Sequence, residues 1–189
     1  SDALRYEVAA ELMQELAKEK HIAKLSAYRA MLPTETKYCK PALLPHTSLI
    51  WKNKEMLVDG EVLDTLESRS VQVAKYKESA CCVDYETVIK ADVKTARELF
   101  KRPLVYIFHD TIDAASHGAG AGDVIAACRK AIEQLAVLVR RLHASWNVTN
   151  VVLTADHGFL YNDVEFAEKD KHAAVSYTHL RAHETRSNL

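Results

Sequence analysis

The chain has 189 residues, the length of about one domain, and 48% of them are hydrophobic, which is enough to bury a sizeable core. Its 25 basic and 26 acidic residues nearly cancel, so the charge excludes a histone-like nucleic-acid binder and an acidic tail. No run approaches the roughly 18 apolar residues of a membrane helix, and no basic-then-apolar leader opens the chain. We therefore expect a soluble, cytoplasmic protein with no membrane partner.

The four cysteines are scattered irregularly, and none of them forms a CxxC pair. This pattern is unlike a small disulfide scaffold, so reduced, buried thiols are expected. The four residues are Cys39, Cys81, Cys82 and Cys128.

Helical and strand-like hydrophobic periods alternate along the first half of the chain. Leu4, Val8, Leu12 and Leu16 recur at helical spacing. The Asp-Gly pair at 59–60 accepts the positive φ angles of a tight hairpin turn. In chain order we expect a helix over residues 4–18, a strand over 22–27, a helix over 36–44, a hairpin over 57–62, and helices over 68–78 and 91–101.

The second half reads as strand, helix and strand. Residues 104–108 form an unbroken apolar run, which is typical of a strand buried on both faces. Asp123 then offers an N-cap to a long helix that reaches about Leu142, and residues 151–153 are the next strand. Such a unit joins parallel strands, so the expected fold class is α/β, with a mostly parallel sheet flanked by helices.

Both ends of this fold are expected to be incomplete. The opening SDALRYE has no methionine and leads directly into a helix, which suggests that a strand precedes Asp2. Residues 175–185, VSYTHLRAHET, resemble a translated sequencing adapter rather than a protein segment. We therefore expect a partial domain over residues 1–174 and a non-native tail over 175–189, which removes His179 and His183 from the candidate ligands.

Polar residues that follow strands are the first candidates for a site, because parallel sheets bind ligands beyond the carboxyl ends of their strands. Asp156 and His157 follow the predicted strand at 151–153, and Gly158 lets the backbone turn so that both face one ion. A carboxylate with an imidazole suits Zn²⁺ or Mn²⁺. The alternative is a strand-end aspartate that caps the next turn beside an incidental histidine.

A second pair follows the predicted strand at 104–108. Asp113 and His117 are four residues apart, so on a helical turn both side chains lie on the same face, as a metal site requires. The alternative is a helix N-terminus at which Asp113 balances the helix dipole and His117 is solvated.

Two further candidates come from the beginning of the chain. Thr36 starts a helix shortly after Pro33, and a hydroxyl at that position is either a cap or a nucleophile. Asp2 lies where the missing first strand should end. Together with the two pairs above, these residues fall at the same predicted edge of one sheet.

Four segments in this order, SDALRYE, LPTETKYCKPALLPH, VYIFHDTID and TADHGFLY, resemble the PglZ domain of bacterial BREX phage-defence systems, a branch of the alkaline phosphatase superfamily. The resemblance covers residues 1 to about 163. It implies an alkaline-phosphatase-like core and phosphoryl or sulfuryl transfer at two divalent metal ions, Zn²⁺ first, with Mn²⁺ or Mg²⁺ as alternatives.

The resemblance also implies a role for each candidate residue. Thr36 corresponds to the nucleophile, which would form a covalent phosphothreonine that water then hydrolyses. The metal ligands that it implies are Asp2, Asp156 and His157 for one ion, and Asp113 and His117 for the other.

The chain departs from the family pattern at the second metal. The branch often has an acidic residue where this chain has His117. The last histidine of that site has no match, because His172 lies in a polar stretch beside the suspected tail. Either the fragment stops short of that histidine or the second site is incomplete.

Two functions fit these residues. The first is a metal-dependent phosphohydrolase of phosphomonoesters or phosphodiesters, with nucleic acid among the candidate substrates. The second is a non-catalytic structural subunit that binds the methyltransferase and ATPase of a BREX complex. A scaffold has no need of a nucleophile beside two metal sites, so Thr36 favours the enzyme, although the fragment alone is expected to be inactive.

No recognisable pattern identifies the substrate. Lys37, Lys40 and Arg69 could neutralise a phosphate, but a solvated surface position is the simpler expectation for each. Trp51 and Tyr76 are as compatible with packing as with base stacking.

Overall fold

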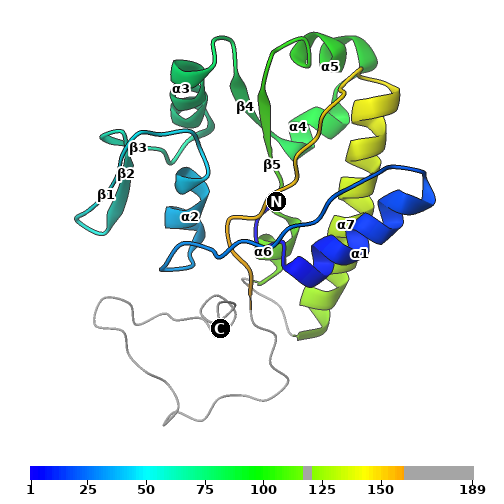
Figure 1. The fold of residues 1–189 in the computed structure, drawn as a ribbon, viewed down its shortest axis with the longest axis horizontal. Helices are drawn as coiled ribbons and strands as arrows, with labels where there is room; N and C mark the ends of the chain where they lie inside the picture. Colours follow the sequence, from blue (N-terminus) through cyan, green and yellow to red (C-terminus); the bar gives the residue numbers. More distant parts are fainter. Residues whose placement is uncertain (117–120, 160–189) are drawn as a thin grey trace.

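The computed structural model describes residues 1–116 and 121–159, in which helices lie on both sides of a small parallel sheet and a second small sheet lies at one edge of the molecule (Figure 1). In chain order the elements are α1 (Tyr6–Lys18), α2 (Thr36–Ala42), β1 (Leu49–Lys52), β2 (Glu55–Val58), β3 (Glu61–Val62), α3 (Leu66–Tyr76), β4 (Cys81–Asp84), α4 (Tyr85–Lys90), α5 (Val93–Leu99), β5 (Val105–Phe108), α6 (Thr111–Ser116) and α7 (Ala121–Ala144).

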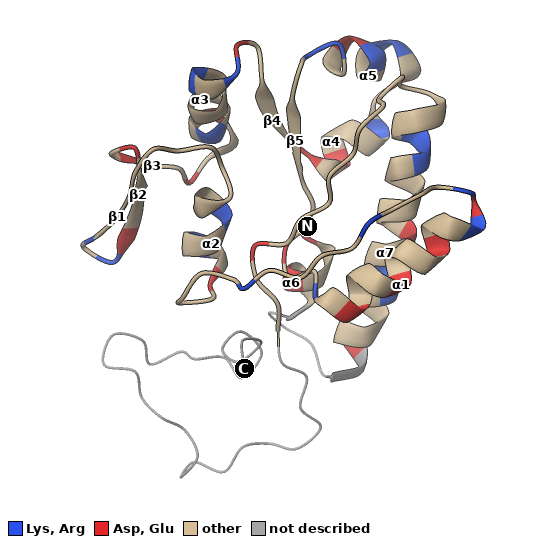
Figure 2. Ribbon diagram, in the orientation of Figure 1, with Lys and Arg blue, Asp and Glu red and all other residues tan. Residues whose placement is uncertain are grey.

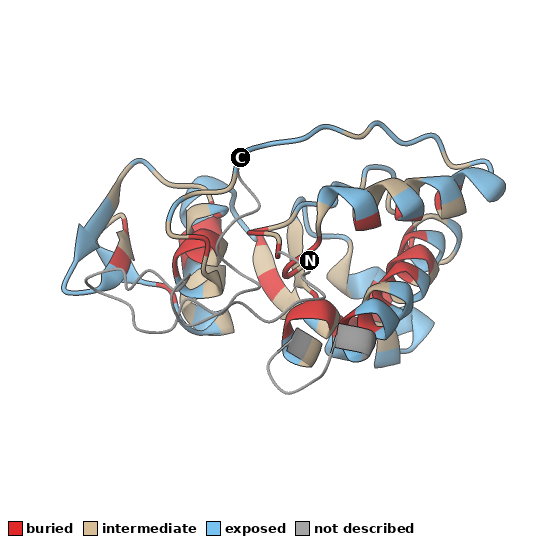
Figure 3. Cartoon of the chain, turned by 90° about the horizontal axis from the view of Figure 1, so that it is seen from below, coloured by how far each residue is buried: buried red, intermediate tan, exposed pale blue. Residues whose placement is uncertain are grey.

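Helices α1 and α7 pack against each other and carry the larger core (Figure 1). In α1, the buried residues are Val8, Leu12 and Leu16, as the helical spacing predicts. Leu135 and Leu142 of α7 join them, and Figure 3 shows the buried residues as a stripe along this long helix. Among the described helices, none combines the length and the apolar character that crossing a bilayer requires, and Figure 2 shows charged residues along α7.

A second core joins α2, α3 and the three-stranded sheet. Tyr38 of α2, Val58 of β2 and Val73 of α3 are completely buried in it. Trp51 of β1 packs on Tyr38, with the ring centroids 4.4 Å apart. Because α2 is anchored in this core by one face, the side chains on its other face are directed toward the C-terminal end of β5 and toward the residues that follow 151–155.

The predicted helices in the first part of the chain and the hairpin are confirmed, although three of the four helices begin two residues before or after the predicted start. The helix predicted over 91–101 begins only at Val93, because the Asp92 side chain accepts hydrogen bonds from two backbone amides and caps α5. Asp123 is not the N-cap of α7, because that helix already begins at Ala121. In the first turn, its carboxylate still interacts favourably with the helix dipole.

The α/β class is confirmed, but the sheet is smaller and less parallel than predicted. Strands β4 and β5 pair in parallel, from Cys81 opposite Val105 to Asp84 opposite Phe108. Strands β1, β2 and β3 form a separate antiparallel sheet around the hairpin. The described residues therefore do not form the mostly parallel sheet that the sequence predicted.

Two predicted strands, 22–27 and 151–153, are not strands, and neither has a ladder partner within residues 1–116 and 121–159. Most of their apolar side chains are exposed, with Ile22 at 102% and Val152 at 87%. A strand forms by pairing its backbone with a neighbour, so an apolar run without a partner stays irregular. The residues of β5 are also only half-buried, since β4 alone pairs with it in the described part.

The hairpin turn between β2 and β3 depends on Asp59. Asp59 and Gly60 have φ angles of 51° and 88°, which suit a tight primed turn. The Asp59 carboxylate accepts hydrogen bonds from four residues before and after the hairpin, namely Thr47, Ser48, Gln72 and Tyr76. One side chain thus joins the sheet to α3.

We expect Asp59→Ala to lower the melting temperature of the full-length protein by several degrees, because the buried Gln72 amide and the turn lose their acceptor. The exposed Glu61 on β3 provides the matched control, and Glu61→Ala should leave the melting temperature unchanged. Thermal unfolding followed by circular dichroism measures both. Equal melting temperatures for the two variants would contradict a stabilising role for this network.

Candidate functional site

Chain segments far apart in the sequence meet beyond the end of β5. The backbone amide of Asp2 donates to the carbonyl of His109, which follows β5, at 2.7 Å. The amino group of Ser1 donates to the carbonyl of Thr154 at 2.6 Å. These two bonds hold the first residues between the two segments, so the Asp2 carboxylate lies beside the turn at residues 156–158.

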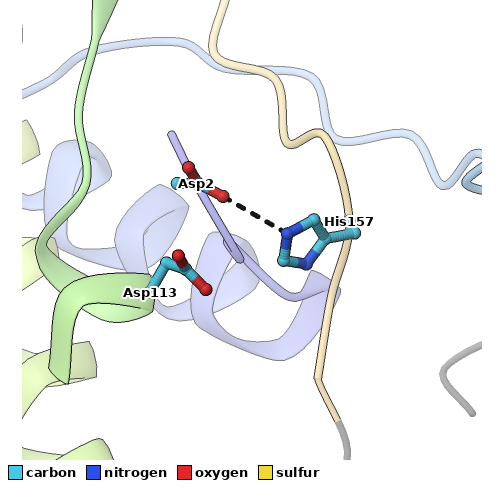
Figure 4. Close-up of side chains that lie close together, drawn as sticks. All are labelled: Asp2, Asp113 and His157. Atoms are coloured by element: carbon cyan, nitrogen blue, oxygen red, sulfur yellow. Dashed lines mark ion pairs between the residues drawn. The ribbon is translucent and has the colours of Figure 1, made fainter. Parts of the chain in front are cut away.

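Three buried side chains form the centre of the site (Figure 4). Asp2, Asp113 of α6 and His157 offer ligand atoms that lie within 4.8 Å of one another. These residues are 3%, 7% and 3% exposed, and His157 Nε2 lies 3.4 Å from Asp2 Oδ1. Two enclosed carboxylates and an imidazole are a suitable donor set for Zn²⁺ or Mn²⁺.

The His157 ring directs one nitrogen at this centre. Its Nδ1 lies 3.0 Å from the carbonyl oxygen of Gly158, which can only accept, so Nδ1 carries a proton and donates it. Its Nε2 faces Asp2 and Thr36. Metal-binding histidines are typically fixed in this way through the nitrogen that does not bind the metal.

Asp156 adds another buried carboxylate next to His157. Its Oδ1 accepts hydrogen bonds from the backbone amides of Ala3 at 3.2 Å and His157 at 3.0 Å. Its Oδ2 is buried, lies 3.7 Å from His157 Nε2 and accepts no hydrogen bond from the described part of the chain. Burial raises the pKa of Asp156 to about 6, and the charge of Asp2 acts in the same direction. Such an oxygen fits a site that a cation completes.

The Thr36 hydroxyl points into the same centre. It lies 2.8 Å from His157 Nε2 and 3.3 Å from Asp2 Oδ1. Glu35, and not Thr36, occupies the N-cap position of α2, so the hydroxyl is not used as a helix cap. Of the two roles that the sequence left open for this residue, the helix cap is therefore wrong, and the nucleophile stays a prediction.

Asp2 and His157 stabilise each other's charged forms. Burial alone would raise the pKa of Asp2, but contacts with His157, Asp156 and Lys40 keep this pKa below its usual range. Burial alone would lower the pKa of His157, but the hydrogen bond to Asp2 and the charge of Asp156 raise it to about 9. A proton on His157 thus offsets negative charge at the point where a bound cation would also act.

The structure brings together five of the six predicted site residues, namely Asp2, Thr36, Asp113, Asp156 and His157. His117 lies outside the described residues, as do His172, His179 and His183. The central cluster combines ligands that the family resemblance assigned to two different ions.

The sequence interpretation did not anticipate the position of Lys40. Instead of a solvated surface, its ammonium group forms an ion pair with Asp2 Oδ2, and its side chain is 17% exposed. The signal was present in the sequence, because Lys40 is four residues after Thr36 and therefore lies on the same face of α2.

His109 is a second residue whose place the sequence did not indicate. Its Nε2 lies 2.9 Å from Gln134 Oε1, which can only accept, so Nε2 donates and Nδ1 accepts from the Ser1 hydroxyl at 3.0 Å. Burial lowers the pKa of His109, which favours this neutral form. The ring thereby connects the opening segment, and with it Asp2, to α7.

Comparison with known proteins identifies the family. Residues 1–186 match the family described as the BREX system PglZ alkaline phosphatase-like domain. The chain belongs to the PglZ family. The match of the PglZ domain continues into residues 175–186, and the boundary expected after residue 174 lies outside the described residues and stays a prediction.

Two curated relatives are similar to most of the chain. The chain is 31% identical over 175 residues to "Alkaline phosphatase-like protein PglZ" of Bacillus cereus (strain H3081.97). It is 33% identical over 177 residues to "Alkaline phosphatase-like protein BrxZ" of Escherichia coli O9:H4 (strain HS). Each alignment covers 90% of this chain and 20% of the relative, so the chain spans about a fifth of their length. No solved structure matches the chain.

Proposed function

We propose that this PglZ domain is the phosphohydrolase part of a BREX phage-defence protein and that Thr36 is its nucleophile. The observation that supports this most directly is the Thr36 hydroxyl, 2.8 Å from His157 Nε2 and beside a buried cluster of potential metal ligands. The substrates are phosphomonoesters or phosphodiesters, nucleic acid included. The four unpaired cysteine thiols support a reducing, cytoplasmic location.

Two divalent cations are part of the proposal, with Zn²⁺ as the first candidate and Mn²⁺ or Mg²⁺ as alternatives. The residues proposed to hold them are Asp2, Asp113, His117, Asp156 and His157. When bound, such cations polarise the phosphoryl oxygens and favour ionisation of a nearby hydroxyl. The buried Asp156 Oδ2, which accepts no hydrogen bond from the described residues, supports their fit.

The residues of the chain then perform a two-step transfer. Thr36 Oγ1 loses its proton and forms a bond to phosphorus, while the bond from phosphorus to the leaving oxygen breaks and that oxygen takes up a proton, which gives phosphothreonine and a free alcohol. Water next cleaves the phosphothreonine, releases the phosphate product and restores the hydroxyl. Because α2 is fixed in the second core through Tyr38, Thr36 is held in place for both steps.

The proposed partners are the other subunits of a BREX complex, among them the methyltransferase and the ATPase, and DNA as a possible substrate polymer. The two relatives carry PglZ and BrxZ names, and the matched family is described as part of the BREX system. These observations support an assembly with BREX proteins.

The proposed activity is tested with the full-length protein. An aryl phosphate, an aryl phosphodiester and plasmid DNA are each incubated with the metal-free protein supplemented with Zn²⁺, Mn²⁺ or Mg²⁺. We expect turnover of at least one substrate with one of the metals, and none after chelation. If the protein hydrolyses none of them with any metal, the structural-subunit role becomes the better explanation.

A further inference from the structure

We propose that Lys40 binds an oxygen of the phosphoryl group presented to Thr36 and gives the site a preference for the dianionic phosphate of a monoester. This inference rests on the proposed function and narrows its substrate class. Its basis is the position of the Lys40 ammonium group, which lies inside the site and on the same carboxylate as the Thr36 hydroxyl.

Both side chains reach Asp2 from one face of α2. Thr36 Oγ1 lies 3.3 Å from Asp2 Oδ1, whereas the Lys40 ammonium group forms its ion pair with Oδ2 of the same carboxylate. Residues four apart on a helix lie one above the other, so this arrangement follows directly from their spacing. A group that reacts with Thr36 therefore comes within reach of a fixed positive charge.

Lys40 is held in an enclosed place. Its side chain is 17% exposed and that of Asp2 is 1% exposed. Its Nζ lies 5.9 Å from the centre of the Phe108 ring, at the end of β5. An ammonium group that has lost most of its water needs an anionic partner, so in this enclosed place Lys40 favours a second anion when Asp2 is used elsewhere.

The anion that pairs with the Lys40 ammonium group is expected to change when Asp2 binds a cation. A carboxylate that neutralises a divalent ion attracts a nearby ammonium group less strongly. The phosphoryl group of the substrate brings new negative charge to the same place. Lysine is a common phosphate ligand because its flexible side chain carries a compact charge with three donors.

The neighbouring basic residues are committed to other contacts. Lys37 is exposed, and its Nζ donates to the Lys54 carbonyl at 2.8 Å. The Arg69 guanidinium donates to the carbonyls of Leu63 and Asp64. Lys40 is thus the member of the three candidate phosphate binders that contacts a residue of the candidate site.

The charge of the substrate gives the proposal a specific consequence. A phosphomonoester carries up to two negative charges and a phosphodiester carries one, so the attraction to Lys40 is about twice as large for the monoester. Removing the ammonium group should therefore impair monoester hydrolysis more than diester hydrolysis. A residue that only holds Asp2 in place would affect both reactions equally.

The test compares Lys40→Met and Lys40→Gln with Lys40→Arg in the full-length protein, and Lys37→Met is the matched control on α2. Inorganic phosphate is titrated calorimetrically into the metal-loaded proteins, and bound metal is counted by mass spectrometry. We expect both neutral variants to bind phosphate at least about tenfold more weakly with unchanged metal content, and Lys40→Arg to restore most of the affinity. The Lys37→Met variant should behave as wild type.

Kinetics with the aryl phosphate and the aryl phosphodiester complete the test. In Lys40→Met we expect kcat/KM to fall about a hundredfold for the monoester and clearly less for the diester. Equal losses for the two substrates, wild-type phosphate binding in both neutral variants, or a loss of bound metal would each overturn the proposal. If the wild type hydrolyses neither of these substrates nor plasmid DNA with any metal, the proposed function fails, and the phosphate titration still decides whether Lys40 binds phosphate.

Discussion

Thr36→Ala is expected to abolish phosphoryl transfer, with a decrease in kcat on the order of 10⁴-fold or more. The variant removes the hydroxyl that lies 3.3 Å from Asp2 Oδ1 and 2.8 Å from His157 Nε2. Thr36→Ser keeps that hydroxyl and should retain measurable turnover. Steady-state hydrolysis of the substrate found active for the wild type measures both variants.

Two further measurements separate a lost nucleophile from a damaged site. Metal content should be the same in Thr36→Ala and in the wild type, because the proposed ligands are untouched. Thr149→Ala, which removes an exposed hydroxyl far along the chain, should leave turnover unchanged. Mass spectrometry of the acid-quenched wild type should detect phosphate on Thr36, and substantial turnover by Thr36→Ala would show that another group attacks phosphorus.

Local patterns predicted the elements whose stability is local or whose partner is close in the sequence. The apolar spacing of α1 needs only one complementary surface, which α7 provides. The hairpin at 57–62 depends on a turn that Asp59 and Gly60 specify by their backbone preferences. In such cases the sequence contains the information within a few residues.

The two predicted strands that did not form could not be judged from local sequence alone. Residues 22–27 and 151–153 have strand-like composition, but a strand needs a backbone neighbour from elsewhere in the chain. Within residues 1–116 and 121–159 neither segment finds one. Residues 151–155 still bring Asp156 and His157 to the site, because the Ser1 amino group donates to the carbonyl of Thr154 and the Asp2 amide donates to the carbonyl of His109.

The convergence of the candidate site could be predicted because its residues follow elements that end on one side of the fold. Asp113 follows β5, and Asp156 follows the segment at 151–155. What could not be predicted is which oxygen faces which partner, since this depends on side-chain rotamers and on burial. Lys40 illustrates the difference, because helical spacing places it near Thr36 but only the structure shows its ion pair with Asp2.

The metal-free protein is expected to lose stability as the pH rises from about 6.5 to about 9. Folding raises the pKa of His157 from its ordinary 6.5 to about 9, so the folded state holds this proton more tightly than the unfolded state. The resulting stabilisation is complete below pH 6.5 and is lost as the pH rises through the folded pKa. For a completely buried imidazole this amounts to about 3 kcal/mol.

Thermal unfolding of the full-length protein in a chelator, at several values between pH 6 and pH 9.5, measures this loss. His157→Gln should flatten the dependence, whereas His143→Gln, which alters a half-buried histidine on α7, should not.

Added Zn²⁺ should reverse the trend, because a metal ion binds the neutral imidazole and takes over the charge that the proton supplied. At a concentration about a hundredfold above Kd, it should stabilise the protein by about 2.7 kcal/mol. Its apparent Kd should fall as the pH rises, since fewer protons compete for His157 Nε2. Stabilisation by Zn²⁺ that is equal at pH 6.5 and pH 9, or that persists undiminished in His157→Gln, would show that the ion binds elsewhere and that the buried cluster of Asp2, Asp113 and His157 does not hold it.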